Sequence, residues 1–578
     1  MNTPTEDSLR SLPPGTPKKM TLLHRVARLW WLVRTLVRSG LIAPLRPDKY
    51  LRMAQVIRRQ GVSAMTGLSL AAVRRPHGTA LIDERGTLTW SEVEARANAV
   101  AVGLASLSEE PLETVAILCR NHRGFVEALS ATARIGADAL LLNTGFSGPQ
   151  LTDVLQREGA QVVVYDEEFA PLLDQARAEL AGLVEVVAWT DDGSDTTTVD
   201  DLIEAHLGAV PDRPGRTGRT ILLTSGTTGT PKGARRSGGG GAGALAAMLD
   251  RIPWRAEQTT VVAAPMFHAW GFGQLAISAT LTCTVVMRRR FDPEATLELV
   301  DRYRASGLAV VPVMLERIVG LPAEVLASHE LSSLRFVTAS GSRMRSDALL
   351  QFMDAFGDIV YNSYNATEAG LISAAVPADL RVAPDTAGRA VVGTDLLIVD
   401  DDGAELGPGE VGRILVRSDS QFEGYTSGDS KDFHESYMVS GDVGRLDDTG
   451  RLFVVGRDDE MIVSGGENVY PLEVEETLGS HDAVLEAVVV GVDDRDFGQR
   501  LAAYVVLQGG AEASAADLKR HVKGQLAGYK VPREVTFLDE LPRNASGKVM
   551  KRELAPDPSD QTTDQTADQT SGQTLGPG

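Results

Sequence analysis

Hydrophobic residues recur along the chain in two alternating patterns, one typical of helices and the other of buried strands. Residues 92–107 and 124–135 repeat their apolar side chains at helical spacing. Short apolar runs predict strands at residues 114–118, 162–165, 184–187, 220–223 and 308–311. Strands that alternate with helices imply parallel sheets covered by helices. We therefore predict an α/β fold from residue 75 to about residue 456.

Length and composition divide the chain into segments. At 578 residues it is too long for one compact core. Residues 1–17 are polar and rich in proline, and residues 556–578 repeat Asp-Gln-Thr without an apolar stripe, so both ends are predicted to be disordered. Between them we expect a basic extension at 18–60, a large domain of helix-covered sheets at 61–456, a hinge at 457–460 and a small mobile α+β domain at 461–555.

Residues 20–40 form a strongly amphipathic helix candidate. Its apolar face is formed by Leu22, Val26, Leu29, Trp30, Val33 and Val37, whereas Arg28, Arg34 and Arg38 lie off that face. The arginines interrupt the apolar run too often for a transmembrane span. A basic amphipathic helix with tryptophans is typical of peripheral contact with a membrane surface, here the inner face of the membrane. Packing against the protein's own body explains the pattern equally well, and the sequence favours neither.

Charge is distributed unevenly along the chain. The net charge is −21, but residues 1–60 hold twelve Lys/Arg and three acids, which leaves −30 on the remainder. Such an acidic body argues against nucleic acid as a partner. Cys119 and Cys283 are the only cysteines, so neither a disulfide framework nor a structural zinc site is expected. No cleavable signal peptide opens the chain, and we expect a cytoplasmic protein.

The most informative motif is Leu222-Leu-Thr-Ser-Gly-Thr-Thr-Gly-Thr-Pro-Lys-Gly233, in which an apolar lead runs into glycines and hydroxyls. Glycines let several backbone N–H groups converge on one anion, and the hydroxyls and Lys232 add donors and charge. These are the properties of a phosphate-binding loop. It is not the GxxxxGK[ST] loop, because Pro231 stands at the second glycine and no Ser or Thr follows the lysine. Taken alone, such a loop is also compatible with a flexible linker.

Four further motifs follow in a fixed order. They are Tyr364-Asn-Ala-Thr-Glu368, Ser440-Gly-Asp442, Gly456-Arg-Asp-Asp459 with the segment 461–471 after it, and Leu541-Pro-Arg-Asn-Ala-Ser-Gly-Lys548. Together with the loop they resemble the adenylate-forming superfamily, which includes acyl-CoA synthetases, luciferases and peptide-synthetase adenylation domains. The resemblance covers roughly residues 75–555. One departure is Asn365, where the family usually has glycine.

The resemblance implies a reaction that uses ATP, Mg²⁺ and coenzyme A. Glu368 resembles the magnesium-binding glutamate, and Thr367 beside it resembles a donor to the α-phosphate. Asp442 resembles the carboxylate that accepts both ribose hydroxyls, and Arg457 would add a ribose or phosphate contact. The resemblance also implies a site for the β- and γ-phosphates, formed by Thr224, Ser225, Gly226, Thr227, Thr228, Gly229 and Lys232. Adenine would lie between two segments, with Gly341 and Ser342 on one side and Tyr364 and Asn365 on the other.

Two further residues resemble those with which the family carries out two reactions in turn. Lys548 resembles the catalytic lysine, whose ammonium bridges carboxylate and α-phosphate oxygens as charge builds. Asp459 occupies the hinge position. Rotation there would exchange Lys548 for the loop after the hinge. In that loop Ser464, Gly465 and Gly466 would border the tunnel for coenzyme A.

Pro265-Met-Phe-His-Ala-Trp-Gly271 resembles a family motif that borders the acyl carbonyl and the acyl tunnel. The resemblance makes His268 a catalytic candidate and assigns Phe267, His268, Trp270 and Gly271 to the acyl pocket. The apolar segments 261–264, 275–281 and 309–315 would line a slot for a chain or form plain sheet core. The sequence does not separate these two roles.

Taken together, the resemblance implies an AMP-forming fatty acyl-CoA synthetase for medium or long chains, with a fatty acid, ATP and coenzyme A as substrates. The alternatives are a fatty acyl-AMP ligase that delivers to an acyl carrier protein, and a ligase for aryl or short-chain acids. Carrier-dependent relatives typically carry an insertion before the hinge, and the interval 368–442 has no obvious extra segment. Intact Lys548, Glu368 and Asp442 argue against a binding protein without catalysis.

A nicotinamide-dependent oxidoreductase is a further rival. The GxGxxG match at 238–243 follows Ala-Arg-Arg-Ser rather than a strand, which argues against a dinucleotide site. The oligomeric state stays open, with a homodimer among the options.

Overall fold

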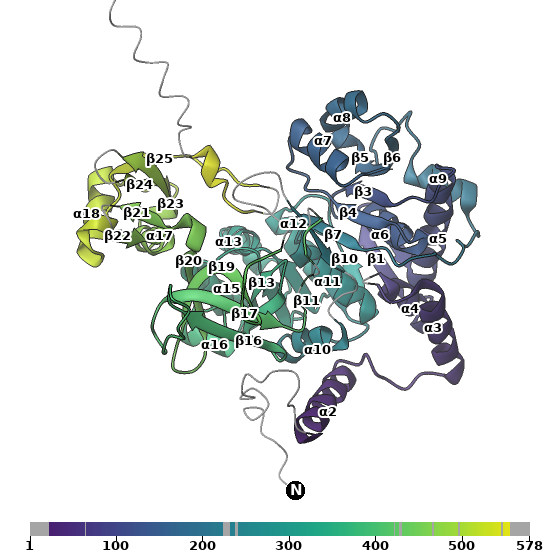
Figure 1. The fold of residues 1–578 in the computed structure, drawn as a ribbon, viewed down its shortest axis with the longest axis horizontal. Coiled ribbons are helices and arrows are strands. Elements are labelled where there is room, and N and C mark those ends of the chain that lie inside the picture. Colours follow the sequence, from purple (N-terminus) through teal and green to yellow (C-terminus); the bar gives the residue numbers. More distant parts are fainter. Residues whose placement is uncertain are drawn as a thin grey trace, which may run out of the picture. The chain divides into compact units, whose positions relative to one another are not determined.

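Two compact units make up the chain in the computed structural model (Figure 1). The structure describes residues 22–63, 65–223, 232–236, 241–420, 422, 424–426, 430–464, 467–494, 498–544 and 547–554. The first unit runs as far as Ser440 and includes Arg445–Val454, and the second includes Gly441–Gly444 and Val455–Asn544. The terminal segments 1–17 and 556–578, expected to be disordered, lie outside the described residues.

The largest sheet of the first unit has nine strands in the order β15-β14-β13-β12-β11-β9-β10-β1-β2. Its six central strands, from β13 to β1, pair in parallel, and the strands at both edges are antiparallel. The strands are β1 (Thr79–Asp83), β2 (Gly86–Thr89), β9 (Thr259–Val262), β10 (Thr284–Val286), β11 (Gly307–Val310), β12 (Phe336–Ala339), β13 (Val360–Ala366), β14 (Gly370–Ala375) and β15 (Arg389–Ala390).

A second sheet has six strands in the order β6-β5-β3-β4-β7-β8, parallel except for the last pair. The strands are β3 (Thr114–Leu118), β4 (Asp138–Leu141), β5 (Val162–Asp166), β6 (Val184–Trp189), β7 (Thr220–Leu223) and β8 (Gly233–Arg236). The prediction of helix-covered parallel sheets is therefore confirmed. The sequence did not reveal the antiparallel edges.

Helices cover both sheets. The helices of the first unit are α2 (Leu22–Arg38), α3 (Pro47–Gln60), α4 (Thr66–Arg74), α5 (Trp90–Ser106), α6 (Arg123–Ile135), α7 (Gly148–Arg157), α8 (Asp174–Glu179), α9 (Val199–His206), α10 (Gly241–Arg251), α11 (Ala269–Thr280), α12 (Pro293–Arg302), α13 (Pro312–Val319), α14 (Ala323–Ala327), α15 (Ser346–Phe356) and α16 (Pro377–Val382). Local signals set several ends. Thr89 and Glu92 form a capping box before α5, and Gly136 ends α6 in the left-handed conformation.

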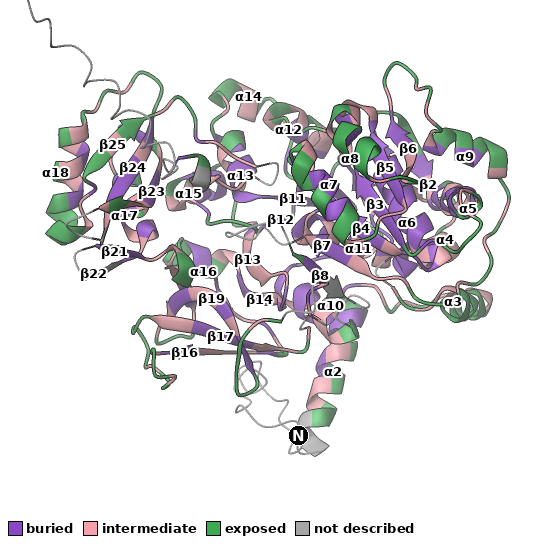
Figure 2. Cartoon of the chain, turned by 45° about the horizontal axis from the view of Figure 1, so that its top comes forward, coloured by how far each residue is buried: buried purple, intermediate pink, exposed green. Residues whose placement is uncertain are grey.

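One layer of helices is shared by the two sheets. Successive residues of β9 and β11 point to opposite faces, so that Val261 and Leu308 enter one core and Val262 and Ala309 enter another. The second of these cores also contains the inner residues of β3 and the buried faces of α5, α6 and α11. The opposite face of the second sheet packs against α7 in a separate core. Figure 2 shows the strands of both sheets as largely buried.

A third, antiparallel sheet follows in the chain, in the order β16-β17-β19-β18 with β20 beside β19. The division between the two units falls within β19 and β20. Its strands are β16 (Thr394–Val399), β17 (Gly412–Ser418), β18 (Phe433–His434), β19 (Tyr437–Leu446) and β20 (Leu452–Arg457).

The second unit has its own core and its own sheet, which is antiparallel except for the parallel β24–β25 pair. Buried residues of the long β23–β24 pair meet those of α17 and α18. The α+β class expected for this part of the chain matches these elements. They are β21 (Ile462–Ser464), β22 (Glu467–Val469), α17 (Pro471–Gly479), β23 (Val484–Asp494), β24 (Gly498–Leu507), α18 (Ala515–Gln525) and β25 (Glu534–Phe537).

Candidate active site

The candidate site of the first unit lies along the carboxyl edge of the nine-stranded sheet. Strands β9, β11, β12 and β13 are parallel neighbours, so the segments that follow them emerge at the same edge. His268 follows β9, Gly341 and Ser342 follow β12, and Thr367 and Glu368 form the turn after β13. Topology therefore gathers three motifs that lie far apart in the sequence.

Glu368 is buried and is held by a residue that no sequence motif indicated. The hydroxyl of Tyr425 donates a 2.6 Å hydrogen bond to Glu368 Oε1. Lys232 Nζ lies 5.4 Å from the centroid of the same tyrosine ring. Tyr425 thus connects the lysine of the phosphate loop with the candidate metal-binding carboxylate, and its ring is in range for a cation–π interaction.

Main-chain contacts fix Tyr425 in place. Tyr425 forms an antiparallel bridge with Ala234 of β8, and Thr426 N–H donates to Gly233 O at 2.8 Å. Phe422 N–H donates to Glu368 O at 2.8 Å. These contacts join the turn after β13, the strand after the phosphate loop and segment 424–426. A carboxylate beside a threonine hydroxyl is a suitable pair of hard oxygen donors for Mg²⁺.

Asn365, the departure from the family pattern, has a structural partner. Its side-chain Nδ2 donates to Ser340 Oγ at 2.7 Å, and Ser340 begins the small-residue segment that contains Gly341 and Ser342. Gly341 has φ +107°, a conformation that side chains rarely adopt. The asparagine therefore links β13 to the loop after β12, the two segments between which the resemblance predicts an adenine site.

His268 precedes α11 and is uncharged at neutral pH. Its Nε2 is buried and has no hydrogen-bond partner among the described residues. Burial lowers the pKa of His268 to about 4. The Phe267 ring contacts the imidazole with centroids 4.6 Å apart. A neutral imidazole can donate or accept one hydrogen bond at this edge, but it does not supply a positive charge.

The other pocket candidates pack tightly. Phe267 and Trp270 are buried in two different cores, and Trp270 Nε1 donates to Val310 O at 2.9 Å, which anchors α11 to β11. A Cβ on Gly271 would lie 2.2 Å from Pro265 O, so only glycine fits there. Gly273, two residues further along, is half-buried, and a Cβ there would meet nothing within 4 Å.

The second unit brings together four of the predicted residues, Asp442, Arg457, Asp459 and Lys548. Arg457, at the end of β20, donates from Nε to Asp459 Oδ1 at 2.8 Å. Burial opposes the charge of Arg457, but the hydrogen bond to Asp459 and the charge of Asp442 outweigh it and raise its pKa. The pKa of Lys548 is lowered, mainly by burial, and the charges of Glu460 and Asp442 oppose this shift. The negative charge of Asp442 therefore acts on both Arg457 and Lys548.

Of the three residues predicted to border the coenzyme A tunnel, Ser464 is among the described residues. Ser464 is buried at the end of β21, where it pairs with Glu467 of β22. The candidates outside the described residues are Thr224, Ser225, Gly226, Thr227, Thr228, Gly229, Gly465 and Gly466.

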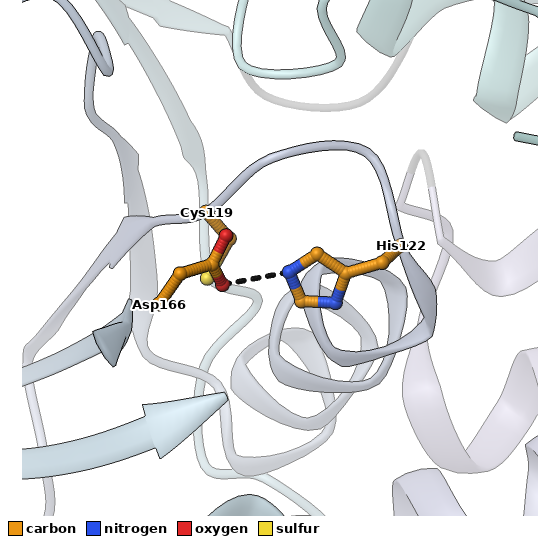
Figure 3. A group of neighbouring side chains, drawn as sticks. All are labelled: Cys119, His122 and Asp166. Carbon is orange, nitrogen blue, oxygen red and sulfur yellow. Dashed lines mark hydrogen bonds and ion pairs between the residues drawn. The ribbon is translucent and has the colours of Figure 1, made fainter. Parts of the chain in front are cut away.

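A separate polar cluster lies in the first unit, formed by buried Cys119, His122 and Asp166 (Figure 3). His122 Nδ1 accepts a hydrogen bond from Gly124 N–H at 3.0 Å, and Nε2 donates to Asp166 Oδ1 at 2.7 Å. Both ring nitrogens are therefore engaged, and neither has a lone pair free for a metal. Burial raises the pKa of the Cys119 thiol. We interpret the cluster as a buried hydrogen-bond network with a structural role.

Comparison with known proteins relates both units to one family. The family model described as AMP-binding enzyme matches residues 68–426, and that of the AMP-binding enzyme C-terminal domain matches residues 473–548. The indoleacetate–CoA ligase of Aromatoleum aromaticum is 34% identical over 83% of this chain and 95% of its own length. A long-chain-fatty-acid–CoA ligase of Mycobacterium tuberculosis is 30% identical over 81% and 92%.

A solved structure shares the fold as well. The o-succinylbenzoate CoA synthetase of Bacillus subtilis, in complex with its acyl-adenylate intermediate, superposes with a TM-score of 0.73 at 29% identity. The superposition covers 84% of this chain and 97% of that one.

The two glycines of α11 provide a matched test of its packing. Gly271→Ala should lower the free energy of unfolding by about 1–3 kcal/mol, because the new methyl group meets main-chain atoms that cannot move aside. Gly273→Ala should be neutral or stabilising by up to about 1 kcal/mol, because alanine is the better helix former and the space is open. Thermal unfolding of both variants measures the difference. Equal midpoints would contradict the close approach of α11 to Pro265.

Proposed function

The chain belongs to the AMP-binding enzyme family, and from this premise we propose that it is an AMP-forming CoA ligase acting on a hydrophobic acid that carries an aromatic ring. In such a reaction the carboxylate of the acid attacks the α-phosphorus of ATP and pyrophosphate leaves. The thiol of coenzyme A then attacks the acyl carbonyl, and AMP leaves. The matched family models, which together extend over both units, are the observation that carries this proposal.

The first step joins two anions, so fixed positive charge should dominate its catalysis. In our proposal Lys232 and the loop before it bind the β- and γ-phosphates. Glu368 and Thr367 are the residues that would hold Mg²⁺, which when bound screens the phosphate charges. Tyr425 keeps the Glu368 carboxylate oriented through its 2.6 Å hydrogen bond. Asn365 keeps the loop of Gly341 against β13, where adenine would stack on Tyr364.

The acid is proposed to lie along α11, beginning at His268. The half-buried positions on this helix include Ala269, Phe272, Gly273 and Ala276, which are apolar or small. A Cβ at Gly273 would meet nothing within 4 Å, so we propose that the ring of the acid approaches the helix at this glycine. Neutral His268 adds no charge that would favour a polar tail. The indoleacetate and o-succinylbenzoate ligases, by name, act on acids with an aromatic ring, which supports this class.

A fatty acid of medium or long chain is the second candidate. The same apolar face of α11 accommodates a methylene chain, and the mycobacterial relative is by name a long-chain-fatty-acid–CoA ligase. The aromatic class is preferred here because the indoleacetate ligase shares the higher identity, 34% against 30%.

The second unit is proposed to serve both half-reactions in turn. Lys548 would neutralise charge during adenylate formation, together with Arg457 and Asp442 on the ribose. Asp459, hydrogen-bonded to Arg457, is the proposed hinge. After rotation there, Ser464 and the two glycines after it would border the path of the CoA thiol.

The substrate class is tested with a panel of acids. Pyrophosphate release should be measured for indole-3-acetic, cinnamic and phenylacetic acids and for saturated fatty acids of increasing length, with and without CoA. We expect the highest kcat/KM with an aromatic acid, and thioester formation only when CoA is present. A preference for fatty acids would favour the second candidate, and adenylate release without thioester would contradict the ligase assignment.

Tyr425→Phe tests the positioning of Glu368. The variant keeps the ring beside Lys232 but loses the hydroxyl. The lost hydrogen bond to a carboxylate contributes about 1.5–3 kcal/mol, so kcat/KM for ATP should fall about 10- to 100-fold and the Mg²⁺ concentration for half-maximal rate should rise.

Tyr437→Phe is the matched control, because the buried Tyr437 hydroxyl has no hydrogen-bond partner among the described residues. It should leave both quantities unchanged. An unaltered Mg²⁺ dependence in Tyr425→Phe would show that the tyrosine acts only in packing.

Lys548→Ala should separate the half-reactions. Removing a preorganised cation should slow adenylate formation by a factor of about 100 to 1000, whereas thioester formation from presynthesised acyl-AMP should largely survive. Lys551→Ala is the control from the same segment, because Lys551 is paired with Glu460 at 2.9 Å and Glu475 at 3.3 Å. It should cost stability without this selective loss. Single-turnover rates decide the matter, and equal losses in both steps would refute the role of Lys548.

A further inference from the structure

Helix α2 has two apolar faces, and the body of the protein covers only one of them. Trp31 and Leu36 are buried in the main core together with α10 residues such as Ala247 and Leu249. Figures 1 and 2 both show α2 beside α10. The packed face is therefore not the apolar face predicted from the sequence. The alternative prediction, that the helix packs against the protein's own body, applies to the other side of the helix.

Polar contacts fix the position of α2 and of the turn after it. Arg28 pairs with Asp419. Arg74 donates to Gly40 O at 2.8 Å and to Leu41 O at 3.1 Å, and Ala256 N–H donates to Ser39 O at 2.8 Å. Because both its packed face and its C-terminal end are held, α2 presents its other face outward in a defined orientation.

The outward face is apolar. Val26 is 58% exposed, Leu29 60%, Trp30 47%, Val33 45% and Val37 52%. Their spacing places all five on one side of the helix, whereas the buried Trp31, Thr35 and Ser39 lie on the opposite side and Leu36 lies at the border between the two. Leaving five large apolar side chains in water is costly, since burying one contributes about 1.5–3 kcal/mol.

Exposed apolar side chains are concentrated in this part of the chain. Of the 18 large hydrophobic side chains exposed among the described residues, ten lie between Val26 and Val62. Besides those of α2, they are Ile42, Tyr50, Leu51, Ile57 and Val62. Residues 22–62 also hold nine Lys/Arg and one acid, in a protein whose net charge is −21. The family match begins only at residue 68, so this basic apolar segment lies outside the part shared with the family.

From this combination we infer that the outward face of α2 docks on an anionic lipid surface. Arg34 and Arg38 flank the apolar stripe, and the Arg34 guanidinium lies 5.1 Å from the Trp30 ring centroid. Tryptophan and arginine side by side suit the interface between headgroups and acyl chains. No helix in the described parts of the chain has the length and apolarity to cross a bilayer, so the contact is peripheral.

A second copy of the chain is a less suitable partner. In a two-fold dimer the same surface meets itself, so both copies would bring the same positive charge to the interface. An anionic membrane buries the stripe and neutralises these charges together. The inference does not depend on which acid the enzyme activates.

Sedimentation with vesicles tests the inference. The full chain should bind vesicles of 70% phosphatidylcholine and 30% phosphatidylglycerol, and bind pure phosphatidylcholine much more weakly. Val33→Asp/Val37→Asp should reduce the vesicle partition coefficient roughly a hundredfold or more, because two valines leave the lipid and two acids approach it. Val382→Asp, which places the same change on a valine 72% exposed at the end of α16, is the matched control and should bind like the parent.

Arg34→Gln/Arg38→Gln is a second variant that keeps the stripe intact. Each arginine near an anionic surface contributes about 1 kcal/mol, so binding should weaken about 30-fold and the remaining binding should depend less on salt. Pyrophosphate release with a water-soluble acid should be unchanged in all of these variants.

Three outcomes would overturn the inference. They are a parent protein that does not bind the anionic vesicles, an equal loss of binding in Val382→Asp, and light scattering that shows Val33→Asp/Val37→Asp converting a dimer to a monomer. The last outcome would assign the stripe to a second copy of the chain. Failure of vesicle binding with intact ligase activity would leave the proposed function standing.

Discussion

The helix layer between the two parallel sheets is the constraint on which the site depends. α6 is buried along almost its whole length, including its polar positions. Glu127 is 1% exposed and accepts a 2.5 Å hydrogen bond from Arg96, and Arg134 is 3% exposed and donates to Glu94 at 2.7 and 2.8 Å. Breaking such a buried pair typically costs about 3–5 kcal/mol, so the register of this layer is strongly specified. α11 belongs to the same layer, and His268 stands at its start.

Much of the fold could be predicted because the signals are local. Residues 114–118 and 220–223 were expected as strands and have those bounds in β3 and β7. The helix expected at 124–135 begins one residue earlier, in α6. The antiparallel strands β14 and β15 were missed: β15 has only two residues, and no local pattern in β14 indicates the strand with which it pairs. Their pairing is determined by neighbours that a local window does not contain.

The candidate site was predictable only as far as its residues belong to contiguous motifs. Lys232 and Glu368 each stand in such a motif. Tyr425, which contacts both, does not, because its hydrogen bond to Glu368 spans 57 residues and its bridge to Ala234 spans still more. α2 shows a related limit. Its sequence has apolar residues on both sides. The more continuous apolar stripe is the exposed one, and the buried side is the one that packs against α10.

The electrostatics of the site explain why two units would be needed for the proposed chemistry. His268 lies at the edge where the acid is proposed to bind, and burial keeps it neutral. It can orient a carboxylate but cannot offset the repulsion between that carboxylate and ATP. In the proposed reaction this positive charge would come from Lys232 in the first unit and from Arg457 and Lys548 in the second. In the proposed reaction a neutral, apolar surface would retain a hydrophobic acid, and part of the positive charge would be supplied by a separate unit. The same separation would allow that charge to be withdrawn once the adenylate has formed.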